Sequence, residues 1–236
     1  MDIRLHYTEK GTGEPLILLH GNGENSGYFV HQIDFFSQKY RVIAVDTRGH
    51  GKSPRGKAPF GIRQFAEDLR DFMDELEIER ANILGFSDGG NIAVTFALKY
   101  PQRVNRLILN GANLFPRGMR LCVLIPIIIA YRFVSLFASV SERAKKSAGL
   151  LRLMAEEPQI SPRELAGLSV RTLVIAGTRD MVKDSHTRLI FCSLPDAELA
   201  IMKGDHFIAA KKPQEFNRIV WNFLEKQRAP DSIFWR

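Results

Sequence analysis

Short apolar runs recur along this chain, separated by Gly-rich or charged turns. The runs are nearly continuous rather than alternating, which is typical of strands buried on both faces of a sheet. The segments expected to form such strands cover residues 15–20, 41–46, 81–87, 104–112, 170–180 and 197–204. Residues 3–15 instead alternate in polarity, and we expect them to add an antiparallel hairpin strand at an edge of the sheet.

Amphipathic segments lie between the apolar runs. Helical periodicity is clearest over residues 62–76 and 213–226, where apolar side chains recur at three- and four-residue spacing. Further helices are expected at 28–38 and at 88–100, where Pro101 ends the pattern. Strands that alternate with helices in this way predict an α/β fold with a mostly parallel central sheet.

Residues 113–168 break this alternation, because they show helical patterns and no buried strand. The segment falls between the strand that ends at Asn110 and the strand that begins at Val170. Ligands of such sheets bind at the carboxyl ends of the strands. We therefore expect residues 1–112 and 169–236 to form the core, and residues 113–168 to form a helical cap over the site.

The sequence Gly85-Phe86-Ser87-Asp88-Gly89 joins a predicted strand directly to a predicted helix. A nucleophile elbow occurs at such a junction and exposes its serine hydroxyl on a strained turn. Side chains two positions before and after the serine would collide with neighbouring elements, so both positions require glycine. Ser87 is the predicted nucleophile, although a serine here could also simply cap the helix.

A serine hydroxyl needs a base, and the base needs an orienting acid. Asp180 follows the predicted strand 170–180, and His206 follows the last predicted strand. The order Ser87, Asp180, His206 is the one expected for a nucleophile elbow on an α/β sheet. We predict that these three residues form a catalytic triad.

The other histidines fit the base position less well. His20 precedes a Gly-rich turn and is interpreted as a structural hydrogen-bonding group. His50 lies in a loop that could border the site, and a structural role is favoured for it as well. His186 falls on the helix predicted after Asp180 and is interpreted as a surface residue.

Three other positions fit the acid less well. Asp184 lies four residues beyond Asp180, too far along the chain. Asp205 adjoins the predicted base but should point elsewhere. A carboxylate after the strand 104–110 would be a rival acid, but Asn110 stands there.

Acyl transfer also needs donors for an oxyanion. The Gly-rich turn at residues 20–25 brings the backbone N–H of Asn22 towards the backbone N–H of Asp88, and these two groups are the predicted donors. The turn lacks the spacing of a phosphate-binding loop. No H-x-x-x-H or C-x-x-C pair occurs in the sequence, so neither a metal nor another cofactor is expected.

Taken together, the segments "LLHGNG", "VIAVDTRGHGKS", "LGFSDGGNIA", "LVIAGTRDMV" and "GDHFIAAKKPQEFNRIVWNFL" resemble the α/β-hydrolase fold superfamily. The elbow is similar to that of small-lid esterases and the valacyclovir-hydrolase-like group. The resemblance implies a Ser87 nucleophile, a His206 base, an Asp180 partner, and oxyanion donors at Asn22 and Asp88. A serine nucleophile argues against a haloalkane dehalogenase or an epoxide hydrolase.

Composition adds three limits. The chain is 45% hydrophobic and 25% charged, as expected of a globular protein. Its net charge of +7 comes from scattered basic residues without interleaved aromatics, so nucleic-acid binding is not expected. The start of the sequence has no apolar signal segment, and Cys122 and Cys192 are predicted to be buried, unpaired thiols, so a cytoplasmic location is expected.

The apolar stretch at 121–140 contains Pro126, and its uninterrupted core is too short to span a bilayer, so a buried or interfacial segment is expected. Residues 113–168 hold eight Lys or Arg and four Glu. An apolar cap would suit an apolar ester, although its apolar residues could equally pack the cap onto the body. The basic residues also allow an anionic substrate or weak contact with a membrane surface.

We therefore predict a serine hydrolase without cofactors that cleaves a small or medium-sized ester through an acyl-enzyme on Ser87. The same residues would suit amide, lactone, thioester or carbon–carbon bond hydrolysis. They would also suit a ligand-binding receptor that retains the fold.

Overall fold

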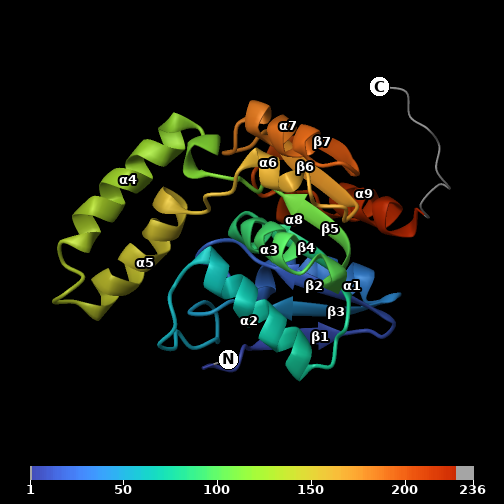
Figure 1. The fold of residues 1–236 in the computed structure, drawn as a ribbon, viewed down its shortest axis with the longest axis horizontal. Coiled ribbons are helices and arrows are strands. Elements are labelled where there is room, and N and C mark those ends of the chain that lie inside the picture. Colours follow the sequence, from blue (N-terminus) through green and yellow to red (C-terminus); the bar gives the residue numbers. More distant parts are fainter. Residues whose placement is uncertain (1, 227–236) are drawn as a thin grey trace.

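The computed structural model describes residues 2–226. In this part of the chain, seven strands form one sheet in the order β1-β3-β2-β4-β5-β6-β7 (Figure 1). Every neighbouring pair is parallel except β1 with β3, which confirms the predicted mostly parallel sheet. The strands are β1 Tyr7–Lys10, β2 Glu14–Leu19, β3 Tyr40–Val45, β4 Ala81–Phe86, β5 Val104–Asn110, β6 Thr172–Arg179 and β7 Ala197–Asp205.

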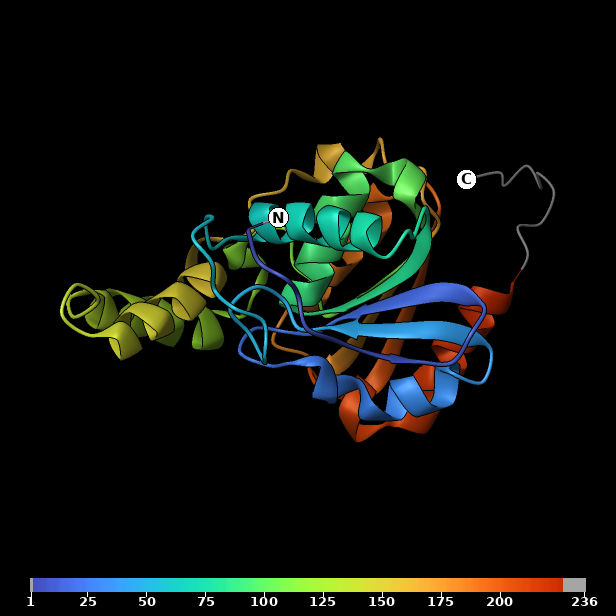
Figure 2. The same ribbon diagram turned by 90° about the horizontal axis from the view of Figure 1, so that it is seen from below.

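Helices cover both faces of the sheet, as Figure 2 shows. One face packs against α2 Ile62–Glu75, α3 Asp88–Lys99, α6 Pro162–Leu165 and α7 Asp184–Ser193. The other face packs against α1 Val30–Phe36, α8 Ile208–Lys211 and α9 Pro213–Glu225. The short helices η1 Ser26–Phe29, η2 Pro101–Arg103 and η3 Pro116–Gly118 complete the connections. The central strands are buried on both sides, which explains their continuous apolar runs.

The predicted edge strand exists, but its predicted pairing in a hairpin is wrong. β1 lies at the edge of the sheet and runs antiparallel to β3, with Tyr7 opposite Val45. It does not pair with β2, the next strand in the sequence, because both edges of β2 are occupied by parallel neighbours, β3 and β4. The only free edge that β1 can join on this side of the sheet belongs to β3.

The segment between β5 and β6 contains two long helices, α4 Leu121–Ser135 and α5 Glu142–Glu156. They pack against each other as an antiparallel pair, here called the α4–α5 hairpin. The hairpin starts at the carboxyl-end edge of the sheet and extends away from the body (Figures 1 and 2). Among the described residues of this insertion, one residue makes a strand-like pairing: Met119 forms an isolated antiparallel bridge with Val182, which follows β6.

Both cysteines are free but exposed, so the expectation of buried thiols is wrong. Cys122 lies on α4, where the projecting hairpin leaves one side of the helix uncovered. Cys192 lies near the end of α7 and is exposed as well. An apolar sequence context therefore did not indicate burial at either position.

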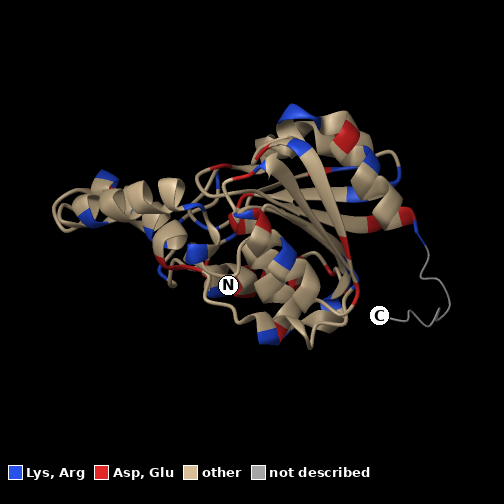
Figure 3. Ribbon diagram, turned by 90° about the horizontal axis from the view of Figure 1, so that it is seen from above, with Lys and Arg blue, Asp and Glu red and all other residues tan. Residues whose placement is uncertain are grey.

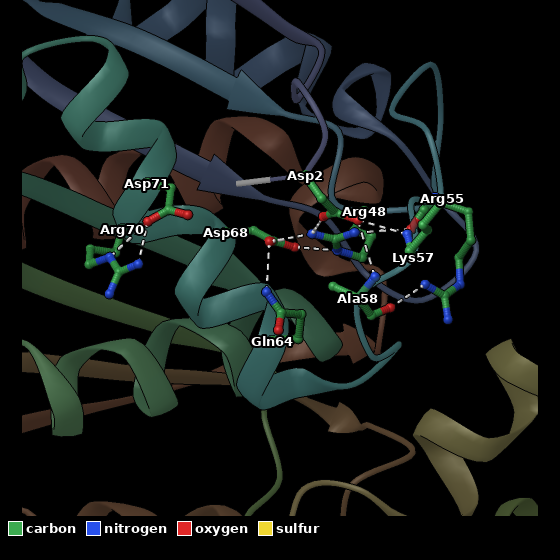
Figure 4. Close-up of polar contacts among 9 residues, drawn as sticks. All are labelled: Asp2, Arg48, Arg55, Lys57, Ala58, Gln64, Asp68, Arg70 and Asp71. Carbon is green, nitrogen blue, oxygen red and sulfur yellow. Dashed lines mark hydrogen bonds and ion pairs between the residues drawn. The ribbon is translucent and has the colours of Figure 1, made fainter.

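A buried ion pair attaches the loop after β3 to α2 (Figure 4). The Arg48 side chain is fully buried, and its Nε and Nη2 atoms each donate to the Asp68 carboxylate at 2.6 Å. Asp2 accepts a further hydrogen bond from Arg48 at 2.7 Å, and Gln64 donates to Asp68 at 3.0 Å. These carboxylates hold the pKa of Arg48 above its ordinary value.

Candidate active site

Ser87 occupies the turn between β4 and α3 in a strained conformation, with φ 53° and ψ −119°. Positive φ is uncommon for a residue other than glycine and requires surrounding structure to hold it. Two hydrogen bonds do so here. The Ser87 N–H donates to the Asn110 carbonyl at 2.8 Å, and the Ser87 carbonyl accepts from the Asn91 N–H at 3.0 Å.

The glycines around Ser87 are required by close backbone contacts. A Cβ on Gly85 would overlap the carbonyl group of Gly89, and a Cβ on Gly89 would overlap the carbonyl group of Leu19. A Cβ on Gly90 would lie 2.8 Å from the Ala112 Cβ. The steric reason predicted for glycine at positions 85 and 89 is therefore present in the structure, and Gly90 extends it.

Asp180 and His206 are brought together by the ends of β6 and β7. The Nδ1 of His206 lies 2.7 Å from Oδ1 of Asp180, and both side chains are buried. The Asp180 carboxylate also accepts hydrogen bonds from the backbone N–H groups of Val182 at 2.9 Å and Gly177 at 3.3 Å. Since Nδ1–H donates to this fixed carboxylate, Nε2 is the nitrogen left to accept a proton.

The imidazole of His206 lies beside the elbow. Its ring centroid is 4.8 Å from that of Phe86, the residue before Ser87. Its Nε2 is buried and has no hydrogen-bond partner among the described residues. Hydrogen bonds between a nucleophile and its base are often long before substrate binds. An unpaired Nε2 beside a strained serine is the arrangement expected of a general base.

Gly111 is a site residue that the sequence reading missed. It has φ +63°, and a Cβ at this position would lie 2.7 Å from Cε1 and 2.9 Å from Nδ1 of His206. The preceding residue, Asn110, accepts the hydrogen bond from Ser87. The end of β5 thus supports the elbow and leaves room for the imidazole. A glycine near the end of the predicted strand 104–112 was the available signal.

The turn after β2 places Asn22 next to Asp88. The Asn22 Nδ2 donates to Asp88 Oδ2 at 2.8 Å and to the Leu150 carbonyl of α5 at 2.9 Å. This amide therefore links the turn, the elbow and the hairpin, and its donors are engaged. The backbone N–H groups of Asn22 and Asp88 have no hydrogen-bond partner within residues 2–226, so both are available as donors.

The carboxylate of Asp88 is buried behind the elbow. It accepts from Asn22 and, at 3.2 Å, from the Asn91 amide. Burial raises the pKa of Asp88 to about 6, and the hydrogen bonds from Asn22 and Asn91 only partly oppose that rise. The sequence predicts a role only for the backbone N–H of Asp88, not for this carboxylate.

His20 and His50 have the structural positions expected of them. The His20 Nδ1–H donates to the Gly21 carbonyl at 2.7 Å, and its Nε2 accepts from the Thr47 N–H at 3.1 Å. Burial lowers the pKa of His20 to about 4, so the ring is neutral at pH 7. His50 is buried and contacts the Arg48 carbonyl at 3.0 Å.

The expectation that His186 is a surface residue is wrong. Its side chain is buried, because residues 113–118 fold across α7. Its Nε2 accepts from the Leu114 N–H at 3.0 Å, and its ring meets Phe115 edge-on at 4.6 Å. The sequence could not indicate this, since the covering segment comes from a different part of the chain.

The two neighbouring aspartates lie away from the imidazole, as predicted. Asp184 pairs with Arg188 in an exposed ion pair on α7. Asp205 pairs with Lys211 and accepts from the Phe207 N–H at 3.0 Å. Within the described part of the chain, no group of three His, Cys, Asp or Glu residues could hold a metal ion.

A groove of about 710 Å³ lies elsewhere, between the start of α2, the end of α3 and the chain after α5. Arg152 and Glu157 line it, but Ser87, Asp180 and His206 do not. Its position follows from packing of the α5 end against α2, where Glu157 accepts from the Ile62 N–H at 2.6 Å. The groove is therefore separate from the candidate site.

Comparisons with known proteins bear on the fold of the chain. A family model described as alpha/beta hydrolase fold matches residues 14–126. A 2-hydroxy-6-oxo-6-phenylhexa-2,4-dienoate hydrolase of Comamonas testosteroni is 28% identical over 96% of this chain and 93% of its own. A 3-oxoadipate enol-lactonase 2 of Acinetobacter baylyi is 27% identical over 93% and 92%. The crystal structure of an enol-lactonase from Burkholderia xenovorans superposes with a TM-score of 0.80 at 23% identity, over 95% and 97%.

Proposed function

This chain belongs to the α/β-hydrolase fold superfamily, and from that premise we propose that it is a serine hydrolase cleaving a small or medium-sized, apolar ester. Membership and fold agree with the resemblance read from the sequence motifs. The serine mechanism and the choice of an ester are our proposal. One observation carries it: a strained Ser87 stands beside a buried Asp180–His206 pair whose Nε2 is unpaired.

In the proposed acylation step, Ser87 Oγ attacks the carbonyl carbon of the ester, and His206 Nε2 takes the hydroxyl proton. Asp180 stabilises the imidazolium through Nδ1. The backbone N–H groups of Asn22 and Asp88 donate to the oxyanion of the tetrahedral intermediate. Collapse of the intermediate breaks the ester bond, and His206 returns the proton to the departing alcohol.

Deacylation repeats these steps with water. His206 Nε2 takes a proton from the water, whose oxygen attacks the acyl carbon. The Ser87 Oγ leaves with the proton returned by His206, and a carboxylic acid is released. No cofactor takes part in this scheme.

A second candidate activity, cleavage of an enol-lactone or of a carbon–carbon bond, is favoured by the relatives. Two relatives that are similar over nearly the whole chain carry the names of an enol-lactonase and of a hydrolase of a hydroxy-oxo-dienoate. The elbow, base and acid proposed here would suit a lactone as well as an ester, because both are attacked at an acyl carbon.

A fluorophosphonate probe tests the nucleophile. We expect it to label the wild-type protein and Ser139→Ala, an exposed serine on the hairpin, but not Ser87→Ala. Loss of one triad member typically lowers kcat about 10⁴-fold or more. A folded wild-type protein that resists the probe, or equal labelling of Ser87→Ala, would contradict the proposal.

A panel of p-nitrophenyl esters, enol-lactones and hydroxy-oxo-dienoates then identifies the bond. We expect steady-state turnover of at least one ester by wild type and Ser139→Ala. Turnover of lactones or dienoates alone would select the second candidate. A single burst equal to the enzyme concentration, with no steady state on any substrate, would instead indicate a ligand-binding receptor.

A further inference from the structure

The helix α4 is apolar nearly all round, yet only part of it is covered. Apart from Arg132 and Ser135, all residues of α4 are apolar or aromatic. Such a helix is normally buried on all sides. Here α5 packs along it, and Leu124 is its only buried residue. The structure therefore leaves a large apolar surface facing outwards.

The exposed side chains fall on one side of the hairpin. Ile125, Ile129 and Phe133 follow one another at four-residue spacing, which stacks them along one helix face. They are 50%, 63% and 63% exposed. The same surface continues past the helix end. We call this set the apolar face: Leu121, Ile125, Ile129, Phe133, Leu136, Phe137 and Val140.

Contiguous apolar surfaces of this kind mark interaction sites on water-soluble domains. Elsewhere on the described chain the large exposed apolar side chains are scattered singly, as on α1 with Val30 and on α7 with Leu189. The hairpin also projects from the body, so its face is accessible to a large partner (Figure 2).

The charge of the chain segment that carries the apolar face is strongly one-sided. Between residues 117 and 147, Glu142 is the one exposed acid, against six exposed basic side chains. Figure 3 shows blue Lys and Arg segments along the hairpin. The six exposed basic side chains are Arg117, Arg120, Arg132, Arg143, Lys145 and Lys146. Basic residues beside an apolar helix face are the pattern of segments that bind anionic lipid.

A second copy of this chain is the less suitable occupant. Two apolar faces packed together would bring two strongly basic segments of chain towards each other, with little acid to neutralise them. Spanning is also excluded by length. Fifteen helical residues reach about 22 Å, whereas a bilayer core is about 30 Å thick. No described helix is long and apolar enough to cross a membrane.

We propose that the apolar face of the α4–α5 hairpin docks onto an anionic lipid surface. The helix α4 lies in the interface plane, its apolar side chains enter the acyl boundary, and the flanking Lys and Arg side chains contact the lipid phosphates. This docking does not depend on the hydrolytic mechanism, since no residue of the apolar face belongs to the candidate site.

Sedimentation with vesicles tests the proposal. We expect wild type to bind vesicles of phosphatidylglycerol and phosphatidylcholine, and to bind pure phosphatidylcholine at least tenfold more weakly. The double variant Ile129→Glu/Phe133→Glu should lose about a hundredfold in binding to the mixed vesicles, because two apolar side chains no longer leave water. The triple variant Arg132→Gln/Arg143→Gln/Lys146→Gln should lose at least tenfold.

Two controls separate docking from folding and from catalysis. Val30→Glu introduces the same charge at a side chain that is 51% exposed on α1, far from the hairpin, and should bind as wild type. Ser87→Ala should also bind as wild type, whatever its activity. Because Ile129 and Phe133 are exposed, the double variant should keep the thermal midpoint of the wild type.

Three results would overturn the proposal. The first is wild type that fails to bind the mixed vesicles. The second is binding that is equal for both lipid compositions or unchanged in the double variant. The third is a concentration-dependent dimer in sedimentation velocity that Phe133→Glu dissociates, in a protein that binds no vesicles; the apolar face would then belong to a contact between copies.

Discussion

At the scale of single residues, the backbone N–H and the side-chain carboxylate of Asp88 have different roles. Its backbone N–H is free beside Ser87, whereas its carboxylate is buried and accepts from the amides of Asn22 and Asn91. The carboxylate therefore positions the turn that carries the other proposed oxyanion donor. Because it is buried, its ionisation opposes folding.

The raised pKa of Asp88 predicts a pH-dependent stability. Between about pH 4 and pH 6 the folded protein holds this proton and the unfolded chain has lost it, so the contribution of Asp88 to stability falls as pH rises. Asp88→Asn removes this loss of stability, because an amide does not ionise. We expect the stability of the variant relative to wild type to increase by up to about 3 kcal/mol from pH 4 to pH 7.

Urea unfolding at pH 4, 5, 6 and 7 measures this difference. Asp205→Asn is the matched control: Lys211 holds the pKa of Asp205 below its ordinary value, so its difference from wild type should be flat above about pH 5. A flat difference for Asp88→Asn as well would show that Asp88 is ionised throughout.

At the scale of secondary-structure elements, the loop 46–61 depends on α2. This loop leads from β3 towards the site, and its Arg48 is buried against Asp68 of α2 (Figure 4). A buried charge that loses its partner is strongly unfavourable, because water cannot replace the lost contacts. The ion pair therefore holds the loop to the helix.

Asp68→Ala should lower the free energy of unfolding by about 3–5 kcal/mol, since it leaves Arg48 buried with Asp2 as its remaining carboxylate partner. The control Asp184→Ala breaks the exposed ion pair with Arg188 and should cost less than about 0.5 kcal/mol. Chemical denaturation of both variants gives the comparison. An equal loss of unfolding free energy in the two variants would mean that water reaches Arg48 in the folded protein.

At the scale of the whole molecule, the insertion between β5 and β6 is fastened to the end of β6 and to α7. The Arg120 N–H donates to the Met181 carbonyl at 2.8 Å, and the Lys183 N–H donates to the Gly118 carbonyl at 2.9 Å. Arg120 Nε also donates to the Asp180 carbonyl at 2.8 Å. The base of the hairpin and the loop of the proposed catalytic acid are thus joined.

His186 belongs to the same attachment, and its pKa is lowered to about 4 by burial, with a contribution from Lys183. The unfolded chain binds this proton between about pH 6.5 and pH 4 and the folded protein does not, so stability is lost as pH falls through this range. Relative to wild type, His186→Gln should therefore gain up to about 3 kcal/mol between pH 7 and pH 4.

Thermal or urea unfolding of both proteins across that range checks the prediction. Asp88 acts in the opposite direction over pH 4–6, so the comparison must be made between variant and wild type at each pH. A difference that does not change with pH would mean that the His186 ring is protonated in the folded protein or accessible to water.

The sequence by itself determined the elements and the order of the proposed chemical groups. Continuous apolar runs indicated the central strands, because strands buried on both faces need apolar side chains at every position. Glycines at 85 and 89 indicated the elbow, because the backbone there passes too close to Leu19 and to itself for a Cβ. Asp180 and His206 were found from their positions after strands, since parallel strands end at one edge.

Tertiary structure decided what depends on distant segments meeting. β1 joined β3 because β2 had no free edge, and His186 became buried because residues 113–118 cross α7. The Asn22 amide is held by Asp88 and Leu150, and Cys122 is exposed on an uncovered helix. An apolar pattern states which residues favour burial, but only the packing of the whole chain decides which of them are covered.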